Sequence, residues 1–369
     1  MLEAILSAAG YSVGCYTSPH LLRYNERVRI NRQEVTDAAL CRAFAAVEAA
    51  RGAISLTYFE FGTLAALWLF SRQGVGAAVL EVGLGGRLDA VNAFDPDCSV
   101  VTSIALDHMD YLGHTREAIG FEKAGIFRKG RPAICADPLP PASLTDYALQ
   151  IGADLQCIDR DFGFVAEAGQ WRFHGRRGDR HALPYPALSG AFQLSNAAAC
   201  LAALDEMQVC LPVAMNDIRR GLLEVSVPGR FQVLPGAPRV ILDVAHNPHA
   251  AAALAENLRS MAGGKTIAVF SMLADKDITG VVQAMKACVD SWLVAAILEQ
   301  RGASLPQIMD VLNSEGLLDR VSGFACVAEA YRYACNVALE DDKIIVFGSF
   351  YTVAGVLRQR TITDEQSEN

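Results

Sequence analysis

The sequence lacks several features that mark particular classes of protein. No apolar run reaches the ~18–20 residues that a membrane-spanning helix needs, so we expect no membrane span. Basic residues are in the minority, with 32 Lys and Arg against 41 Asp and Glu and a formal net charge of -9. Nucleic-acid binding depends on basic surface, so we expect no nucleic-acid partner. A pocket with local positive charge can still take a small anionic substrate.

Paired cysteines and common catalytic signatures are also missing. None of the ten cysteines lies in a C-x-x-C pair, and there is no zinc-spaced Cys/His cluster and no G-x-S-x-G motif. The cysteines sit in apolar runs such as 133–136, so we interpret them as reduced core residues of a cytoplasmic protein. Scattered disulfides are the weaker alternative. Residues 1–10 do not resemble a signal peptide; they predict the end of a helix that stops at Gly10, with an element missing before it.

The remaining composition favours a large α/β protein of two domains. The chain has 369 residues, and 52% of them are hydrophobic. Short β-branched runs alternate with longer helical patterns, which is typical of βαβ units and a parallel sheet. Strands are expected at 13–16, 77–82, 99–105, 132–135, 239–244, 265–270, 291–296 and 343–347. Helices are expected at 36–51, 61–74, 115–127, 143–151, 190–207, 214–224, 248–261, 277–288, 304–315, 327–340 and 350–359.

Three segments depart from this alternation. Residues 157–188 mix Gly, Arg, aromatics and Pro and predict a small antiparallel hairpin or flap. Pro and Gly cluster at about 228–237, which predicts a linker between domains at 1–227 and 238–369. The polar end, 361–369, is expected to be frayed.

The most informative segment is Glu81–Ala90, Glu-Val-Gly-Leu-Gly-Gly-Arg-Leu-Asp-Ala. A carboxylate ends a predicted buried strand and a glycine-rich loop follows. Ligands of open α/β sheets bind beyond the carboxyl ends of the strands, and glycines there let backbone N–H groups approach an anion. A dinucleotide fingerprint is disfavoured, because Asp89, Asn92 and Pro96 break the chain before a long helix can follow.

Two further residues are candidates for the same site. The next strand leads to His108, which we expect at the same sheet edge as Glu81, on an adjacent strand. A carboxylate and a histidine there can share Mg²⁺ or Mn²⁺, although a polar strand cap explains the spacing equally well. Lys123 lies on a helix with Ala124 and Phe127, where reaching out to solvent is the ordinary explanation.

The second half of the chain repeats this arrangement. A predicted buried strand ends in Asp243, and His246 and Asn247 crowd the loop that enters the next helix. So polar a loop indicates a binding site, with an Asx-turn and helix cap as the alternative. The segments 275–277 and 348–352 follow two later strands and are expected at the same edge of a parallel sheet.

Together these segments resemble the folylpolyglutamate/dihydrofolate synthases of the Mur ligase superfamily over essentially the whole chain. The landmarks are Thr17–Leu21, Glu26–Ile30, Leu56–Glu60, Leu80–Asn92, Thr102–His108, Glu122–Ile126, Pro228–Arg230, Asp243–His249 and Gly348–Phe350. The resemblance implies a Mur-ligase-like α/β fold, with an N-terminal P-loop-type ATPase domain (here truncated) and a smaller C-terminal Rossmann-like domain. It also implies a monomer that uses ATP, two Mg²⁺ sites, L-glutamate, and dihydropteroate or folates.

The resemblance further implies roles for individual residues. Glu81 and His108 correspond to Mg²⁺ ligands, and Lys123 to a lysine that becomes carbamylated and holds a second Mg²⁺. Lys123 and His246 are the expected catalytic residues, with His246 and Ser349 at the glutamate or phosphate end. The expected ATP contacts are Asn196, Arg230 and Asp243. The expected pterin-side residues are Ser18, His20, Thr57, Tyr58, Phe59, Glu60, Leu88, Asp89 and Ala90.

The implied reaction transfers the γ-phosphate of ATP to a carboxylate, and glutamate then attacks the acyl phosphate. The family's Gly-Thr-Asn-Gly-Lys-Gly-Ser/Thr phosphate loop and the strand before it have no counterpart here. We therefore expect a chain cut short or a start assigned too late, with weak ATP binding, little catalysis and an exposed sheet edge. A non-catalytic folate- or partner-binding remnant and another Mur-superfamily amino-acid ligase are the alternatives.

Overall fold

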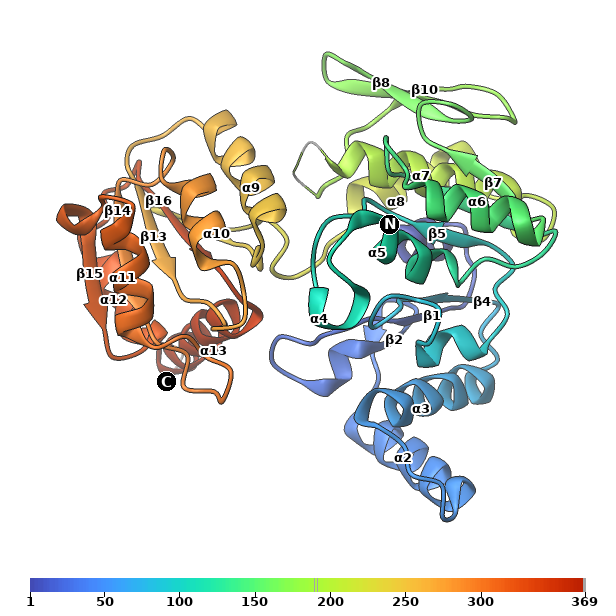
Figure 1. Cartoon of the computed structure of the whole chain (residues 1–369), viewed down its shortest axis with the longest axis horizontal. Helices are drawn as coiled ribbons and strands as arrows, with labels where there is room; N and C mark the ends of the chain where they lie inside the picture. Colours follow the sequence, from blue (N-terminus) through green and yellow to red (C-terminus); the bar gives the residue numbers. More distant parts are fainter. Residues whose placement is uncertain (189, 191, 368–369) are drawn as a thin grey trace. The chain divides into compact units, whose positions relative to one another are not determined.

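The computed structural model describes residues 1–188, 190 and 192–367. The chain divides into two compact units, each built around its own core (Figure 1). Unit 1 comprises Met1–Ala187 and Gln193–Val225, and unit 2 comprises Leu188–Phe192 and Ser226–Asn369. No helix of the described chain is both long enough and apolar enough to cross a membrane.

Unit 1 contains two separate sheets with parallel strands. The first has the order β3 (Gln33–Glu34), β2 (Val28–Ile30), β1 (Val13–Tyr16), β4 (Ala77–Leu80), and its β1 and β4 are parallel. The second is the parallel series β5 (Ser99–Val101), β6 (Pro132–Cys135), β7 (Asp154–Cys157). The expectation that Glu81 and His108 follow adjacent strands of one sheet is wrong, because β4 pairs with β1 whereas β5 pairs with β6. No described strand is hydrogen-bonded between β4 and β5.

The helices of unit 1 are α1 (Leu2–Ala8), α2 (Asp37–Arg51), α3 (Tyr58–Gln73), α4 (Met109–Leu112), α5 (Arg116–Ala124), α6 (Ala142–Ile151), α7 (Phe192–Glu206) and α8 (Met215–Glu224). Local sequence signals bound two of the longest of them, α2 and α3. Thr36 caps α2 by accepting the N–H of Ala39, and Gly74 ends α3 in the left-handed conformation. A Cβ on Gly221 would lie 2.5 Å from the Cα of Ile5, so only glycine lets α8 pack this closely on α1.

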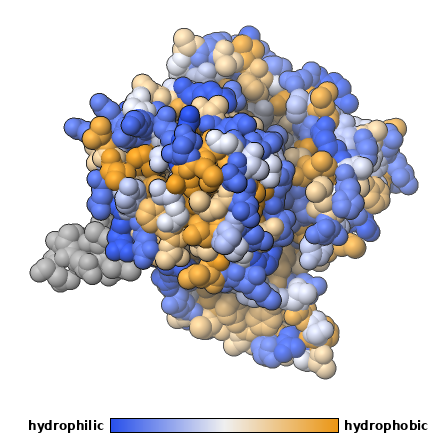
Figure 2. Space-filling model, turned by 60° about the vertical axis from the view of Figure 1, so that its left-hand side comes forward, coloured by the Kyte–Doolittle hydropathy of each residue, from blue (hydrophilic) through white to orange (hydrophobic). Residues whose placement is uncertain are grey.

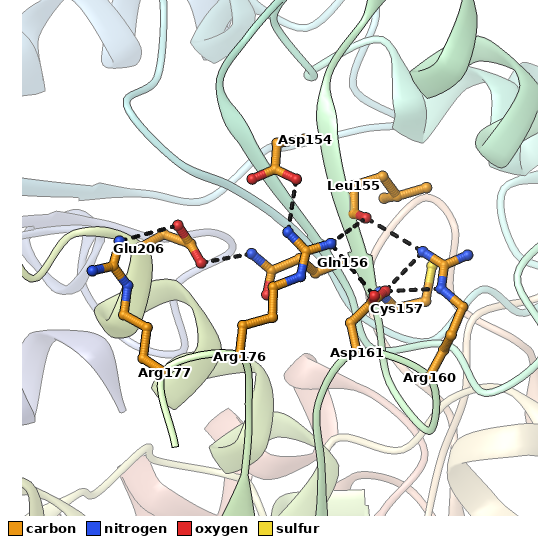
Figure 3. Close-up of polar contacts among 9 residues, drawn as sticks. All are labelled: Asp154, Leu155, Gln156, Cys157, Arg160, Asp161, Arg176, Arg177 and Glu206. Atoms are coloured by element: carbon orange, nitrogen blue, oxygen red, sulfur yellow. Dashed lines mark hydrogen bonds and ion pairs between the residues drawn. The ribbon is translucent and has the colours of Figure 1, made fainter. Parts of the chain in front are cut away.

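The segment expected to form a hairpin or flap is a three-stranded antiparallel sheet. Its strands are β8 (Gly163–Glu167), β9 (Gln170–His174) and β10 (Arg180–Leu183). Figure 3 shows the polar network that ties this sheet to β7 and α7: Arg176 pairs with Asp154 at 2.8 Å, and Arg177 with Glu206 at 3.6 Å. Trp171 of β9 is fully buried in the apolar core of unit 1. Both ion pairs and apolar packing thus hold this three-stranded sheet to the rest of unit 1.

Unit 2 is one six-stranded sheet covered by helices. Its order is β11 (Gln232–Leu234), β12 (Arg239–Leu242), β16 (Lys343–Phe347), β13 (Thr266–Phe270), β14 (Ser291–Ala295), β15 (Val321–Phe324), with only β11 antiparallel. The helices are α9 (Pro248–Ser260), α10 (Ile278–Met285), α11 (Leu305–Ser314), α12 (Val327–Val337) and α13 (Phe350–Ser367). Helices α9, α10 and α11 share a core with one face of the sheet, which includes Phe270, Trp292 and Phe347.

Two expectations for unit 2 were incomplete or wrong. Strands β11 and β15 were not expected, and both are short and only partly buried, which removes the usual apolar signal. The end expected to be frayed is helical as far as Ser367, while residues 368–369 lie outside the described chain. The face drawn in Figure 2 mixes hydrophobic and hydrophilic residues, in keeping with a chain that is 52% hydrophobic and 20% charged.

Candidate active site

The loop that follows β4 is shaped by the carboxylate of Asp89. This carboxylate accepts the backbone N–H groups of Gly83 (3.0 Å), Leu84 (2.9 Å) and Val91 (2.9 Å). Asp89, a predicted pterin-side residue, therefore fixes the backbone of its own loop through these three hydrogen bonds. Its neighbour Leu88 is 81% exposed, leaving an apolar side chain at the surface.

The glycines of this loop allow it to press against α5 and α3. A Cβ on Gly83 would lie 2.5 Å from the ring of Phe59, and one on Gly125, the residue that follows α5, would lie 2.4 Å from the Cβ of Arg87. Arg87 closes the contact: its N–H donates to the carbonyl of Glu122 (2.8 Å), and its guanidinium pairs with the Glu122 carboxylate (2.9 Å). In the structure these glycines therefore allow the loop to pack closely, because a side chain at their positions would clash with its neighbours.

Lys123 follows Glu122 on α5 and is half-buried. Burial lowers the pKa of its amine from the usual 10.5, and the nearby carboxylate of Asp107 acts in the opposite direction. A lowered pKa increases the share of neutral amine, the form that adds carbon dioxide to give a carbamate. The local environment thus suits the modification expected at this position.

Glu81 and His108 lie beyond the ends of β4 and β5. The Glu81 carboxylate accepts the N–H of Ser18 (2.9 Å), and the Glu81 N–H donates to the carbonyl of Tyr16 (2.9 Å), so Glu81 is fixed to the segment after β1. His108 precedes α4 in the left-handed conformation, and its N–H donates to the Asp107 carboxylate (2.8 Å). A left-handed non-glycine residue is uncommon and often occurs at functional positions.

The segment Thr57–Glu60 begins α3 with a reciprocal cap. Thr57 Oγ1 accepts the N–H of Glu60 (3.2 Å), and the Glu60 carboxylate accepts the N–H of Thr57 (2.6 Å). These polar groups hold the helix terminus. Tyr58 is 63% exposed and Phe59 packs on Tyr16, with ring centroids 5.7 Å apart.

Arg27 organises the aromatic residues beside this helix terminus. Its Nε donates to His20 Nδ1 at 2.8 Å, and its guanidinium lies 5.4 Å from the ring centroids of both Tyr24 and Tyr58. Burial and then the Arg27 charge lower the pKa of His20, so the neutral imidazole is favoured. Arg27 was not singled out from the sequence; the only signal was an Arg in the Glu26–Ile30 landmark.

Asn196, the expected ATP contact of unit 1, lies in the first half of α7. It is half-buried, and its Nδ2 donates to Gln193 Oε1 at 3.2 Å. Its carbonyl oxygen therefore has the capacity to accept a further hydrogen bond.

In unit 2, Asp243 follows β12 and accepts the N–H groups of Phe231 (2.8 Å) and Ala245 (2.7 Å). Burial raises the pKa of this carboxyl, while those two N–H groups and the charge of Arg230 act to lower it. His246 Nδ1 contacts the carbonyl of Val244 at 2.9 Å, so Nδ1 carries the proton and Nε2 is the acceptor in the neutral ring.

Two more expected residues of unit 2 gather near the start of α13. Arg230 is exposed and lies over the ring of Phe350, at 5.5 Å from its centroid. Ser349 is buried, and its hydroxyl accepts the N–H of Thr352 (3.0 Å) and shares a hydrogen bond with the Thr352 hydroxyl (2.7 Å). The side chain of Ser349 therefore caps α13.

The donor set of unit 1 fits a Mg²⁺ ion better than a zinc-type site. Over the described residues, no three His, Cys, Asp or Glu side chains form a metal-holding group. Glu81 and His108 offer a carboxylate and an imidazole, and a carbamate on Lys123 would add oxygens. Mg²⁺ keeps several waters and binds proteins through one or two carboxylates together with substrate phosphates, which this sparse set matches.

Comparison with known proteins decides the family. A family described as "Mur ligase middle domain" matches residues 38–137, and one described as "Mur ligase, glutamate ligase domain" matches residues 229–350. The "Dihydrofolate synthase/folylpolyglutamate synthase" of Escherichia coli K12 is 46% identical over 357 residues, covering 96% of this chain and 82% of that protein. This chain belongs to the dihydrofolate synthase/folylpolyglutamate synthase family. The expected family, Mur-ligase-like α/β fold and class of enzyme, an ATP-dependent glutamate ligase, are thereby confirmed.

Solved structures of the family agree in fold over nearly the whole chain. The E. coli enzyme in complex with DHPP and ADP superposes with a TM-score of 0.93 at 46% identity, covering 98% of this chain and 85% of that one. The Yersinia pestis enzyme complexed with AMPPNP and a Mn ion gives a TM-score of 0.91 at 47% identity, with the same coverage of 98% and 85%. The first of these relatives holds DHPP and ADP, and the second holds AMPPNP and a Mn ion.

Proposed function

We propose that this chain joins L-glutamate to dihydropteroate and to the glutamate tails of folates, with ATP as the energy source. The observation that carries the proposal is the environment of Lys123, a half-buried lysine on α5 whose pKa is lowered. The loop that follows Glu81 is bound to the same helix through the Arg87–Glu122 ion pair. The family relationship supports the same activity. We place it in the cytoplasm, where the ten free cysteines stay reduced.

The reaction proceeds in two bond-forming steps. A carboxylate oxygen of the acceptor attacks the γ-phosphorus of ATP, which releases ADP and forms an acyl phosphate. The neutral α-amine of glutamate then attacks the acyl carbon, and phosphate leaves as the amide forms. The amine loses one proton in this step, so a basic group must accept it.

The protein contributes mainly positioning and charge neutralisation. We propose that Glu81, His108 and carbamylated Lys123 hold Mg²⁺, at two sites; bound Mg²⁺ neutralises the charge of the phosphates. The pterin-bearing acid lies against Ser18, His20 and the residues 57–60 and 88–90, in part through the exposed side chains of Tyr58 and Leu88.

The remaining assignments concern the nucleotide and the second substrate. We propose that Asn196, Arg230 and Asp243 contact ATP, and that His246 and the Ser349 segment meet the glutamate or phosphate end. His246 is suited to accept a proton at Nε2, because Nδ1 is engaged by the carbonyl of Val244. Ser349 acts through its backbone, since its side chain caps α13.

The test is a ligation assay with the E. coli relative as the positive control. ADP release should depend on both dihydropteroate and glutamate, and mass spectrometry should find the acceptor enlarged by one glutamyl residue. ADP release that ignores glutamate, or a pterin acid that never gains it, contradicts the proposal. Folate binding without ligation would instead establish the non-catalytic alternative.

A further inference from the structure

The chain between β5 and α4 is held at one residue by an Arg–Asp pair. The N–H of Ile104 donates to Asp137 Oδ2 at 2.6 Å, and its carbonyl accepts from Arg116 Nε at 2.9 Å. Arg116 Nη2 also lies 2.9 Å from both carboxylate oxygens of Asp137. Both backbone groups of Ile104 are thus fixed by two side chains that are bonded to each other.

This pair is built into the fold. Asp137 is only 3% exposed and follows β6, where Ala136 still continues the ladder with Val101. Asp137 and Arg116 also bind the N–H and the carbonyl of Leu139, both at 2.9 Å. Charge-assisted hydrogen bonds of this kind are stronger than neutral ones and fix geometry closely.

The position of Arg116 argues for a role beyond stabilising its helix. Arg116 is the first residue of α5, where the helix dipole disfavours a cation. Lys123 lies seven residues further on, which is about two helical turns, so both side chains leave the same face roughly 10 Å apart. The segment that starts at Ile104 runs to His108, whose backbone N–H donates to the Asp107 carboxylate at 2.8 Å just before α4.

We propose that Arg116 and Asp137 are positioning residues that fix the segment Ile104–His108 along α5 and thereby set His108 relative to Lys123. This inference rests on the proposed function, in which those two residues hold Mg²⁺. Groups that orient metal ligands without touching the metal typically change metal affinity by about 10- to 100-fold when they are replaced. Arg87 and Glu122 fix the loop after Glu81 to the same helix, so α5 connects both ligand-bearing loops.

The experiment compares two ion pairs that lie at opposite ends of strands β5 and β6. Asp137→Asn and Arg116→Lys break the pair beyond the carboxyl ends of β5 and β6. The matched controls, Asp97→Asn and Arg131→Lys, break the exposed pair before their amino ends, where Arg131 Nη1 lies 3.2 Å from Asp97 Oδ1. Mn²⁺ affinity of the full chain is measured by electron paramagnetic resonance with a non-hydrolysable ATP analogue present. Circular dichroism melting checks folding.

We expect Mn²⁺ affinity to fall about 10- to 100-fold in both site variants and to stay unchanged in both controls. If Asp137→Asn does not fold, Arg116→Lys carries the test, because lysine keeps the charge and loses the forked geometry. Unchanged Mn²⁺ affinity in a folded site variant, or an equal loss in the controls, overturns the positioning role and leaves the proposed function standing. Absence of both Mn²⁺ binding and ligation in the unmodified chain overturns both.

Discussion

Gly125, the residue that follows α5, lies against Arg87 of the glycine-rich loop, so Gly125→Ala tests whether that contact matters. An added Cβ would lie 2.4, 2.6 and 2.8 Å from the Cβ, Cα and Cγ of Arg87. Carbon atoms in contact prefer ~3.5–4.0 Å, so the loop has to move by about 1 Å. A new Arg87 rotamer cannot relieve the clash, because Cα belongs to the backbone. Gly125 has φ -59°, an ordinary helical value, so backbone strain does not contribute.

The expected effects are loss of stability and a larger relative loss of activity. Overpacking of this kind costs about 1–3 kcal/mol, which urea unfolding measures. A shift of ~1 Å near reacting groups can lower the rate about 100-fold, which steady-state ligation assays measure. Gly76→Ala is the matched control, because its added Cβ meets only Ser12 O, at 3.7 Å. A Gly125→Ala protein with unchanged stability and ligation rate would show that this contact does not position the loop.

Three further predictions concern single side chains. Lys123→Arg keeps a positive charge but cannot form the lysine carbamate, so the ligation rate should fall about 100- to 1000-fold. The ¹³C NMR resonance of the carbamate, which labelled bicarbonate gives in the unmodified chain, should vanish. Full activity of the variant would exclude the modification. Asp89→Ala leaves three backbone N–H groups without their acceptor and should lower the free energy of unfolding by roughly 1–3 kcal/mol, with an unchanged urea midpoint as the contrary result. The pKa of His20 is lowered from 6.5, so the unfolded chain takes up a proton first as pH falls below 6.5 and the folded state loses stability there. His20→Gln should remove that loss of stability below pH 6.5 and leave the pH dependence above 6.5 unchanged. If the stability of His20→Gln and that of the unmodified chain depend on pH equally, this expectation is contradicted.

Much of the fold could be predicted because its signals are local. Thr36 and Gly74 bound helices α2 and α3 as their residue types indicate, and the buried strands of unit 2 are continuous apolar runs. Strand β15, Val-Ser-Gly-Phe, carries no such run and is recognisable only through its pairing with β14. Whether strands β4 and β5 share a sheet depends on long-range pairing, which spacing along the chain does not encode.

The sequence predicted which residue types form the candidate site, but not the contacts that those residues make. The carboxylate, imidazole and lysine were visible in the sequence. The glycines of residues 83–86 indicated anion binding, which stays a prediction, while their close contacts within the protein could not be foreseen. Nothing in the sequence indicated a role for Asp137 and Arg116, because an Asp after a strand and an Arg at the start of a helix are both common. Their role follows only from the hydrogen bonds that both make to the backbone of Ile104. The residue roles themselves stay predictions until they are measured.

We propose that this chain activates a carboxylate as an acyl phosphate before glutamate attacks it. The most direct measurement uses dihydropteroate labelled with ¹⁸O in its carboxylate and analyses the phosphate released during ligation by mass spectrometry. One carboxylate oxygen bridges to phosphorus in the acyl phosphate and leaves with it, so we expect phosphate that carries one ¹⁸O. Phosphate without the label, or label retained entirely in the pterin product, would contradict it.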